Sequence, residues 1–260
     1  MSIRMSRALA QELGELRYEP TEKRVRAMLG DRAVVDSTRA VLVWEPRRVV
    51  PSYAVPADDV LAELAPVEGQ AADDRPILDP RVPFAAHSTA GQSFDVVIGD
   101  LTLAAAAFTP EDPALHGHVV LDFFAFDTWY EEDEPLVGHP RDPYHRVDVR
   151  RSSRQVRIKL DGRVLAESSS PSLVFETNLP TRFYLPREDV KVELRPSDLH
   201  TYCAYKGKAS YWSIDGEEDL VWGYEAPLPD AAGLEGRVAF FDDRVDVIVD
   251  GVRRERPRPF

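Results

Sequence analysis

The sequence predicts a mainly β protein built from two duplicated, small antiparallel β-sheet domains with short helices. Three observations support this fold class. The two halves of the chain resemble each other, hydrophobic and polar residues alternate over many short runs, and 21 prolines are scattered through both halves. Alternation is typical of half-buried strands, and frequent proline disfavours long helices because proline lacks an amide hydrogen.

The internal repeat is visible without gaps over a long stretch. The segment "TEKRVRAMLGDRAVVDSTRAVLVWE", from Thr21, aligns with "SSRQVRIKLDGRVLAESSSPSLVFE", from Ser152, and this alignment places Glu45 over Glu176. The repeats of solenoid proteins are much shorter than the distance from Thr21 to Ser152, so the pattern indicates a tandem pair of domains. We infer a gene duplication with repeats at residues 18–130 and 152–253, joined by a His/Arg-rich connecting strap at residues 131–151.

Helices are predicted at only a few places. Residues 6–17 carry Leu9, Leu13 and Leu16 on one helical face, and short helical segments are expected after Pro56 and Pro186.

Strands account for the rest of each repeat. In "QVRIKLDGRVLAES", apolar Val156, Ile158 and Leu160 alternate with charged residues, and Asp161-Gly162 follows. An Asp-Gly pair between alternating runs predicts a β-hairpin. The segment "DRVDVIVDG" alternates in the same way and predicts a further strand.

Composition limits the partners. Asp and Glu number 45 against 32 Lys and Arg, a net charge of -13, so we expect no nucleic-acid and no membrane partner, because both favour a basic surface. The single cysteine cannot form an internal disulfide. The N-terminus lacks the pattern of a secretory signal, and no apolar run is long enough to span a membrane. The sequence therefore predicts a cytoplasmic protein and leaves its oligomeric state open.

Several motifs of the second repeat resemble a known family. They are "ETNLPTRFYLPREDV", "CAYKGKASYWS", "VWGYEAPLP" and "GRVAFFDDRVDV", together with the strap "WYEEDEPLVGHPRDPYHRVDVRRSSR". They resemble domain of unknown function 427 in a two-copy bacterial form. The resemblance implies a fold of the beta-tent type, similar to the ligand-binding domain of cereblon and to methionine sulfoxide reductase B. Those relatives bind zinc through cysteine pairs, which this chain lacks, so we predict no metal site and no cofactor.

The family's catalogue label also implies nucleotidyl transfer. That chemistry normally needs paired carboxylates that hold magnesium against a triphosphate. Two adjacent carboxylate pairs are present, Asp58-Asp59 and Asp242-Asp243. Neighbouring residues of an extended chain point to opposite faces, so we interpret both pairs as solvated turns.

The segment "CAYKGKASYW", residues 203–212, allows two interpretations. Cys203 can act as a nucleophile if Lys206 stabilises its thiolate. Alternatively, Cys203 is a small buried residue and Lys206-Gly207 forms a turn between two strands.

Comparison of the repeats favours a pocket in the second one. The alignment places His87 over Cys203, Ala90 over Lys206, and Ala106 to Phe108 over Trp222 to Tyr224, so the first repeat lacks the charged and aromatic groups. We therefore expect a degenerate site in the first repeat and an aromatic pocket for a small molecule in the second. The alternative is that the aromatic residues are ordinary core. The candidate pocket residues are Glu176, Arg182, Tyr184, Lys206, Tyr211, Trp212, Trp222 and Tyr224.

The strap is the second candidate site. His145 can act as a general base oriented by Asp142 or Asp148, and Arg141 and Arg146 can bind an anionic group. The alternative is a structural strap whose polar groups bond to the sheets.

Three functions are therefore open. The leading hypothesis is a protein that binds a small molecule; if it is an enzyme, it acts without a metal, with His145, Lys206 and Cys203 as candidate catalytic residues. The second is a non-catalytic module that binds a peptide or protein. The third is the nucleotidyl transfer that the family label implies.

Overall fold

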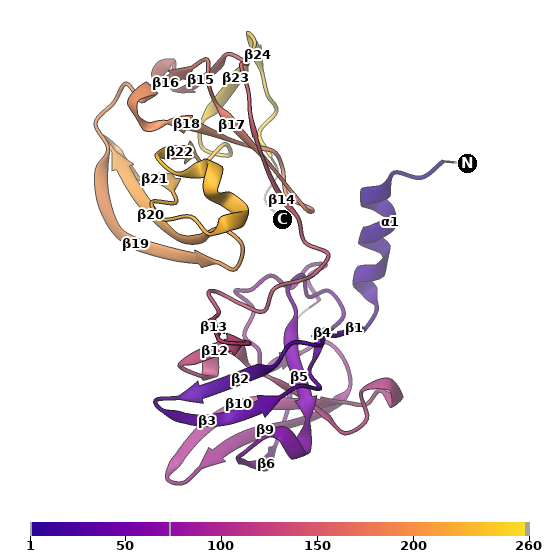
Figure 1. The fold of residues 1–260 in the computed structure, drawn as a ribbon. Coiled ribbons are helices and arrows are strands. Elements are labelled where there is room, and N and C mark those ends of the chain that lie inside the picture. Colours follow the sequence, from indigo (N-terminus) through magenta and orange to yellow (C-terminus); the bar gives the residue numbers. More distant parts are fainter. Residues whose placement is uncertain (1, 73, 258–260) are drawn as a thin grey trace. The chain divides into compact units, whose positions relative to one another are not determined.

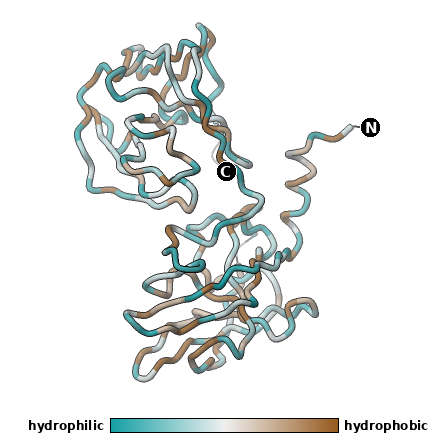
Figure 2. Tube along the Cα trace, in the orientation of Figure 1, coloured by the Kyte–Doolittle hydropathy of each residue, from teal (hydrophilic) through white to brown (hydrophobic). Residues whose placement is uncertain are grey.

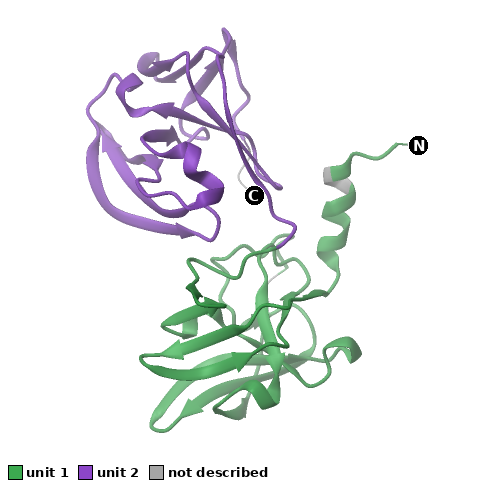
Figure 3. Cartoon of the chain, viewed as in Figure 1, with its two compact units in different colours: residues 1–142 green, residues 143–260 purple. Residues whose placement is uncertain are grey.

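The computed structural model describes residues 2–72 and 74–257 and divides the chain into two compact units, Met1–Asp142 and Pro143–Phe260 (Figure 3). The division falls inside the predicted strap. No helix in the described part of the chain is long and apolar enough to cross a membrane.

Unit 1 contains a seven-stranded and a four-stranded antiparallel sheet, plus a short parallel pair (Figure 1). The large sheet runs, in spatial order, through β1 (Arg17–Pro20), β4 (Val41–Trp44), β5 (Ser52–Pro56), β11 (His118–Leu121), β10 (Leu101–Pro110), β9 (Gly91–Ile98) and β6 (Glu63–Val67). The small sheet runs through β13 (Glu134–Pro135), β12 (Thr128–Glu131), β2 (Val25–Leu29) and β3 (Arg32–Ser37). The parallel pair is β7 (Gln70–Ala71) with β8 (Ala86–His87).

Unit 2 also contains a seven-stranded and a four-stranded sheet. The large sheet runs through β14 (Val147–Arg151), β17 (Ser172–Glu176), β18 (Arg182–Pro186), β22 (Arg237–Phe240), β21 (Glu217–Gly223), β20 (Gly207–Ile214) and β19 (Arg195–Cys203). The small sheet runs through β16 (Arg163–Ser168), β15 (Val156–Leu160), β23 (Asp246–Val249) and β24 (Val252–Arg253). When the strands of each large sheet are numbered in chain order, the two sheets have the same spatial order of strands.

The mainly β prediction is confirmed, and the helices are shorter than the sequence suggests. The predicted helix over residues 6–17 is α1 (Met5–Gln11) followed by the 3-10 turn η1 (Glu12–Gly14). It ends early because Arg17 already pairs with Trp44 in the sheet, and pairing between strands overrides a local helical pattern. The other 3-10 turns are η2 (Ala57–Asp59), η3 (Pro113–Leu115), η4 (Phe123–Ala125), η5 (Arg187–Asp189) and η6 (Pro229–Leu234).

The predicted hairpin joins β15 to β16. Asp161 and Gly162 form its two-residue turn, with φ angles of 48° and 82°. Positive φ at both positions matches the twist of the flanking strands, and glycine adopts it at no steric cost.

Each unit buries its main core between its two sheets. In unit 1 this core contains Val25 and Ala27 of the small sheet with Trp44 and Tyr53 of the large one, and unit 2 repeats the arrangement. Figure 2 shows hydrophobic and hydrophilic residues alternating along strands, as this packing requires. We call the face of each seven-stranded sheet that packs on the small sheet its inner face, and the opposite face its outer face.

Candidate functional site

The outer face of the large sheet in unit 2 gathers most of the predicted pocket residues. Side chains alternate between the faces of a strand, so Phe183 and Leu185 enter the inner core whereas Tyr184 points outward. The outer cluster combines strands that are far apart in the sequence. It contains Val174, Tyr184, Ala209, Trp222, Tyr224, Ala231, Leu234 and Ala239, with Val147, Val149, Cys203, Tyr211 and Phe241 packed against it.

Glu176, the last residue of β17, is the charged centre of this face. One carboxylate oxygen, Oε1, lies 3.1 Å from Nε2 of His145, and the other forms an ion pair with Lys206. The side chains of Glu176 and Lys206 are only 7% and 10% exposed. Burial alone would raise the pKa of Glu176, but the hydrogen bond from His145 and the charge of Lys206 outweigh it and lower that pKa.

His145 is fixed from two sides. Its ring stacks on Tyr205 at a centroid distance of 4.2 Å. The neighbouring Arg146 accepts a hydrogen bond from the backbone N–H of Thr177 and donates its own backbone N–H to the Thr177 hydroxyl. The carboxylate that contacts His145 within unit 2 is therefore Glu176, whereas the sequence predicted Asp142 or Asp148. Asp148 instead pairs with Arg146 and Arg150.

The segment over residues 203–212 forms a turn between two strands, as the second interpretation predicts. Cys203 ends β19, Ala204 to Lys206 form the turn, and Gly207 begins β20 with a φ of 95°, which favours glycine. The turn points the buried Lys206 at Glu176. Cys203 is half-buried and packs against the outer cluster.

Trp222 lies at the middle of the aromatic wall. Its indole Nε1–H donates to the hydroxyl of Tyr184 over 3.0 Å, and its ring lies 4.6 Å from that of Phe241. Burial raises the pKa of Tyr184 and of Tyr224 above the ordinary tyrosine value, so both phenols stay protonated at neutral pH.

Arg182 closes one end of this wall. Its guanidinium carbon lies 5.9 Å from the centre of the Trp222 ring, and the guanidinium forms an ion pair with Asp242. Asp242 lies in a turn, as the sequence predicts, but its side chain is only 14% exposed and is therefore not solvated as expected. Asp59, of the other adjacent pair, accepts hydrogen bonds from Ser37 and Arg39.

Within residues 2–72 and 74–257, no group of three or more His, Cys, Asp or Glu side chains is arranged to hold a metal ion.

Two predicted site residues of unit 2 lie apart from this group. Trp212 is buried in the inner core, as it must be when its neighbour Tyr211 points outward. The Arg146 side chain is 73% exposed and pairs with Asp148. Arg141 belongs to unit 1.

The comparison with protein families bears on this unit alone. Residues 148–251 match the family model of a domain of unknown function, DUF427. No curated protein matches the chain. The matching segment begins at β14 and includes Glu176, Tyr184, Lys206 and Trp222, whereas His145 precedes it.

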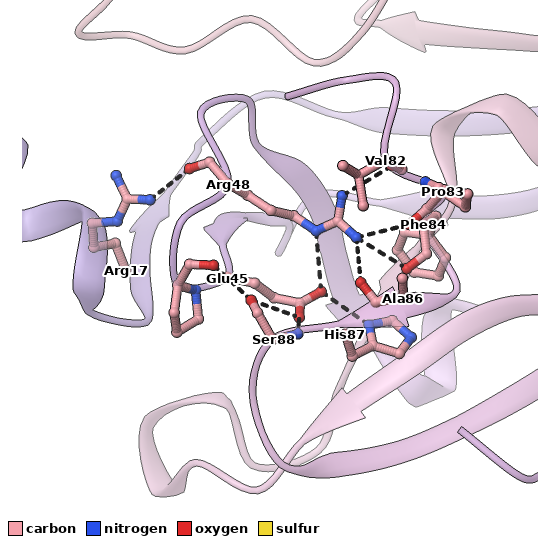
Figure 4. Close-up of polar contacts among 10 residues, drawn as sticks. Arg17, Glu45, Arg48, Val82, Pro83, Phe84, Ala86, His87 and Ser88 are labelled. Carbon is pink, nitrogen blue, oxygen red and sulfur yellow. Dashed lines mark hydrogen bonds and ion pairs between the residues drawn. The ribbon is translucent and has the colours of Figure 1, made fainter. Parts of the chain in front are cut away.

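Unit 1 places a second buried glutamate at the equivalent position. Glu45 follows β4 as Glu176 ends β17, and its side chain is 3% exposed (Figure 4). Its Oε1 lies 3.0 Å from Nδ1 of His87, and its Oε2 accepts a hydrogen bond from the backbone N–H of Ser88 over 2.7 Å. Arg48 lies 3.7 Å from the same carboxylate.

The ladder registers correct the alignment of the outer faces. Phe108 pairs with Val120 and Ser93, and Trp222 pairs with Ala239 and Tyr211. Phe108 is therefore the counterpart of Trp222, where the sequence alignment had placed Ala106. The same registers make Ala54 the counterpart of Tyr184 and Ser93 the counterpart of Tyr211.

Sequence reasoning missed the partners that complete both clusters. Tyr205 and Phe241 of unit 2 and Arg48 of unit 1 were not singled out, although Tyr205 lies inside the segment that was. The repeated glutamate was noticed, and it was the available signal: a carboxylate kept at one place in two copies points to a shared requirement. The histidines that contact the two glutamates come from different places in the chain. His145 precedes β14, and His87 lies in β8.

Proposed function

We propose that unit 2 binds a small molecule on the outer face of its seven-stranded sheet, at the Glu176 cluster. The observation that carries the proposal is the buried Glu176 carboxylate, which holds His145 and Lys206 at the border of an aromatic wall. Aromatic walls with a few convergent polar groups suit ligands that are flat or apolar over most of their surface. Tyr211, Phe241 and Cys203, which pack against the cluster, are half-buried, so solvent reaches them.

The same geometry provides a pair for acid–base chemistry. Glu176 accepts from Nε2 of His145, which keeps the imidazole proton on that nitrogen and leaves the lone pair on Nδ1. In the described part of the chain, Nδ1 has no hydrogen-bond partner, so it is the atom that takes a proton from a bound ligand. Lys206 balances the charge of Glu176 and provides a positive centre for negative charge that develops on the ligand.

Native mass spectrometry of gently purified protein tests the binding proposal. We compare the wild type with Lys206→Ala and with Lys191→Ala, a control whose lysine is 52% exposed and pairs with Glu167. We expect a co-purifying small mass on the wild type and the control and its loss from Lys206→Ala. A mass that stays on Lys206→Ala, or no mass on any of the three proteins after incubation with a metabolite mixture, would contradict the proposal.

The acid–base role is tested separately once a bound mass is known. His145→Ala should retain the ligand and leave it chemically unchanged, whereas the wild type converts it. Conversion at the wild-type rate by a folded His145→Ala protein would remove this role and leave binding as the function.

A further inference from the structure

The outer face of unit 1 is covered by a segment of the same chain. We call residues 78–88, "LDPRVPFAAHS", the plug. It lies between β7 and β9, where unit 1 is longer than unit 2, since in unit 2 only Ala204 to Lys206 separate β19 from β20. Leu78, Val82 and Ala86 of the plug are buried together. Phe84 packs against the outer-face cluster of Val41, Val43, Ala54, Phe108, Leu115 and Val120.

Small residues make room for the plug. Ala54 and Ser93 of unit 1 stand where unit 2 has Tyr184 and Tyr211. His87 occupies part of the space, because its ring stacks on Phe108 at a centroid distance of 3.7 Å. Removing the plug would therefore expose an apolar surface that unit 2 fills with its own strands, and contiguous exposed apolar surface on one protein is typical of a binding site.

Two elements hold the plug through its backbone: β7, which pairs with β8, and a turn that follows β4. We call residues 45–49 the latch. The Arg48 guanidinium donates to the carbonyl oxygens of Pro83 over 2.9 Å, Phe84 over 3.3 Å and Ala86 over 2.6 Å (Figure 4). The backbone of Leu78 donates to Arg47 and accepts from Val49.

Glu45 completes the recognition. It accepts from the imidazole of His87 and from the backbone N–H of Ser88, so the latch offers one carboxylate for N–H donors and one guanidinium for carbonyl oxygens. Next to an apolar strip, that set of groups matches the chemistry of a peptide chain. The unit 2 turn has Leu179 in place of Arg48, and Leu179 is exposed.

The fit of the plug leaves one polar atom unsatisfied. Nε2 of His87 is buried and has no hydrogen-bond partner among the described residues. A buried polar atom without a partner carries a desolvation cost, so the closed arrangement is weaker than its contacts alone would make it. An occupant that avoids this cost can compete with the plug.

We propose that the outer face of unit 1 is a peptide-binding surface that the plug occupies in cis, with Arg48 as the residue that holds it closed. The occupant it accepts in trans is a proline-containing apolar peptide whose carbonyl groups reach Arg48 and whose donors reach Glu45. This proposal concerns unit 1 and does not depend on the ligand of unit 2.

Hydrogen exchange in the full chain tests the latch. In Arg48→Ala we expect the amides of Leu78 and Ala86 to exchange at least about tenfold faster, because several hydrogen bonds are lost, with exchange in β20 unchanged. The control is Arg81→Ala on the plug itself, whose side chain is 83% exposed and pairs with Asp79, and it should exchange like the wild type. Unchanged plug amides in Arg48→Ala would overturn the role of the latch.

A synthetic peptide tests the binding surface. The variant Phe84→Ala/His87→Ala weakens the plug and retains Glu45 and Arg48. We expect it to bind a fluorescent peptide of residues 78–88 saturably, and to bind a scrambled peptide at least about tenfold more weakly. If this variant is folded, with faster plug exchange, and does not bind the peptide, the proposal is wrong. If it does not fold, the same titration on Arg81→Ala/Phe84→Ala decides by the same criterion.

Discussion

The two units stabilise a buried glutamate in different ways. Each has a buried glutamate at the end of its fourth strand, Glu45 directly after β4 and Glu176 as the last residue of β17. Each pairs that glutamate with a histidine that stacks on an aromatic ring. Unit 1 brings the histidine from its plug and covers the outer face. Unit 2 brings it from the strap, adds Lys206, and builds the outer face from large aromatic residues.

This difference shows which parts of the repeat belong to the fold. A buried carboxylate is costly unless charged or hydrogen-bonding groups compensate for the lost hydration. Both units provide such groups, but from positions that are not equivalent in the two repeats. The carboxylate is therefore common to the two units, whereas its partners are specific to each. The aromatic wall and Lys206 exist only where no plug covers the sheet, which is why we place the small-molecule site in unit 2.

The largest expected effect comes from removing the more deeply enclosed glutamate. Glu45→Ala leaves His87, Ser88 and Arg48 without their shared acceptor, so we expect the free energy of unfolding of unit 1 to fall by about 3–5 kcal/mol. Urea denaturation followed by amide exchange in β4 measures it, with the exposed Glu63→Ala as control. A loss below about 1 kcal/mol would show that Glu45 is not the centre of the closed face.

A smaller effect is expected within the aromatic wall. Tyr184→Phe removes the acceptor of the Trp222 indole N–H and leaves that donor buried, which should cost about 1–2 kcal/mol of unit 2 stability. The matched control is Tyr211→Phe, whose hydroxyl bonds Thr201 near the surface and should cost less. Chemical denaturation compares the two, and equal losses would argue against a special role for the Tyr184–Trp222 bond.

The sequence predicts some of this comparison and misses the rest for identifiable reasons. Alternation and the Asp161-Gly162 turn are local signals, so the β class and the hairpin were predictable. Strict alternation should also have separated Tyr211 from Trp212, since consecutive residues of a strand face opposite sides. The contacts from Arg48 to the plug and from His145 to Glu176 join residues more than 30 positions apart, and no local pattern encodes such pairs.

Acid should act on unit 2 through Glu176. Its folded pKa lies below the ordinary value of 4.5, so the unfolded chain binds more protons than the folded one between the two values. The stabilisation by Glu176 is thus present above pH 4.5 and is lost as the pH falls through the folded pKa. Thermal unfolding between about pH 3 and 5 should show a steeper loss for the wild type than for Glu176→Gln. Parallel profiles would contradict the lowered pKa.

The smallest effect is expected at the strap surface. Arg146→Ala removes an exposed side chain that pairs only with Asp148 among the described residues, so stability should change by no more than about 0.5 kcal/mol. The mass bound in native spectrometry should also stay. A clear loss of that mass would restore Arg146 as a ligand-binding residue.

The four tryptophans allow the most direct test of the central claim that the ligand binds on the outer face of unit 2. The indole N–H of Trp222 lies in the proposed site, Trp212 lies in the inner core of the same unit, and Trp44 and Trp129 lie in the core of unit 1. We would titrate ¹⁵N-labelled protein with a library of flat aromatic fragments and follow the indole resonances. The account predicts a saturable shift of Trp222 with at least one fragment while the other three stay in place. A Trp222 resonance that no fragment moves, or equal shifts of all four, would contradict it.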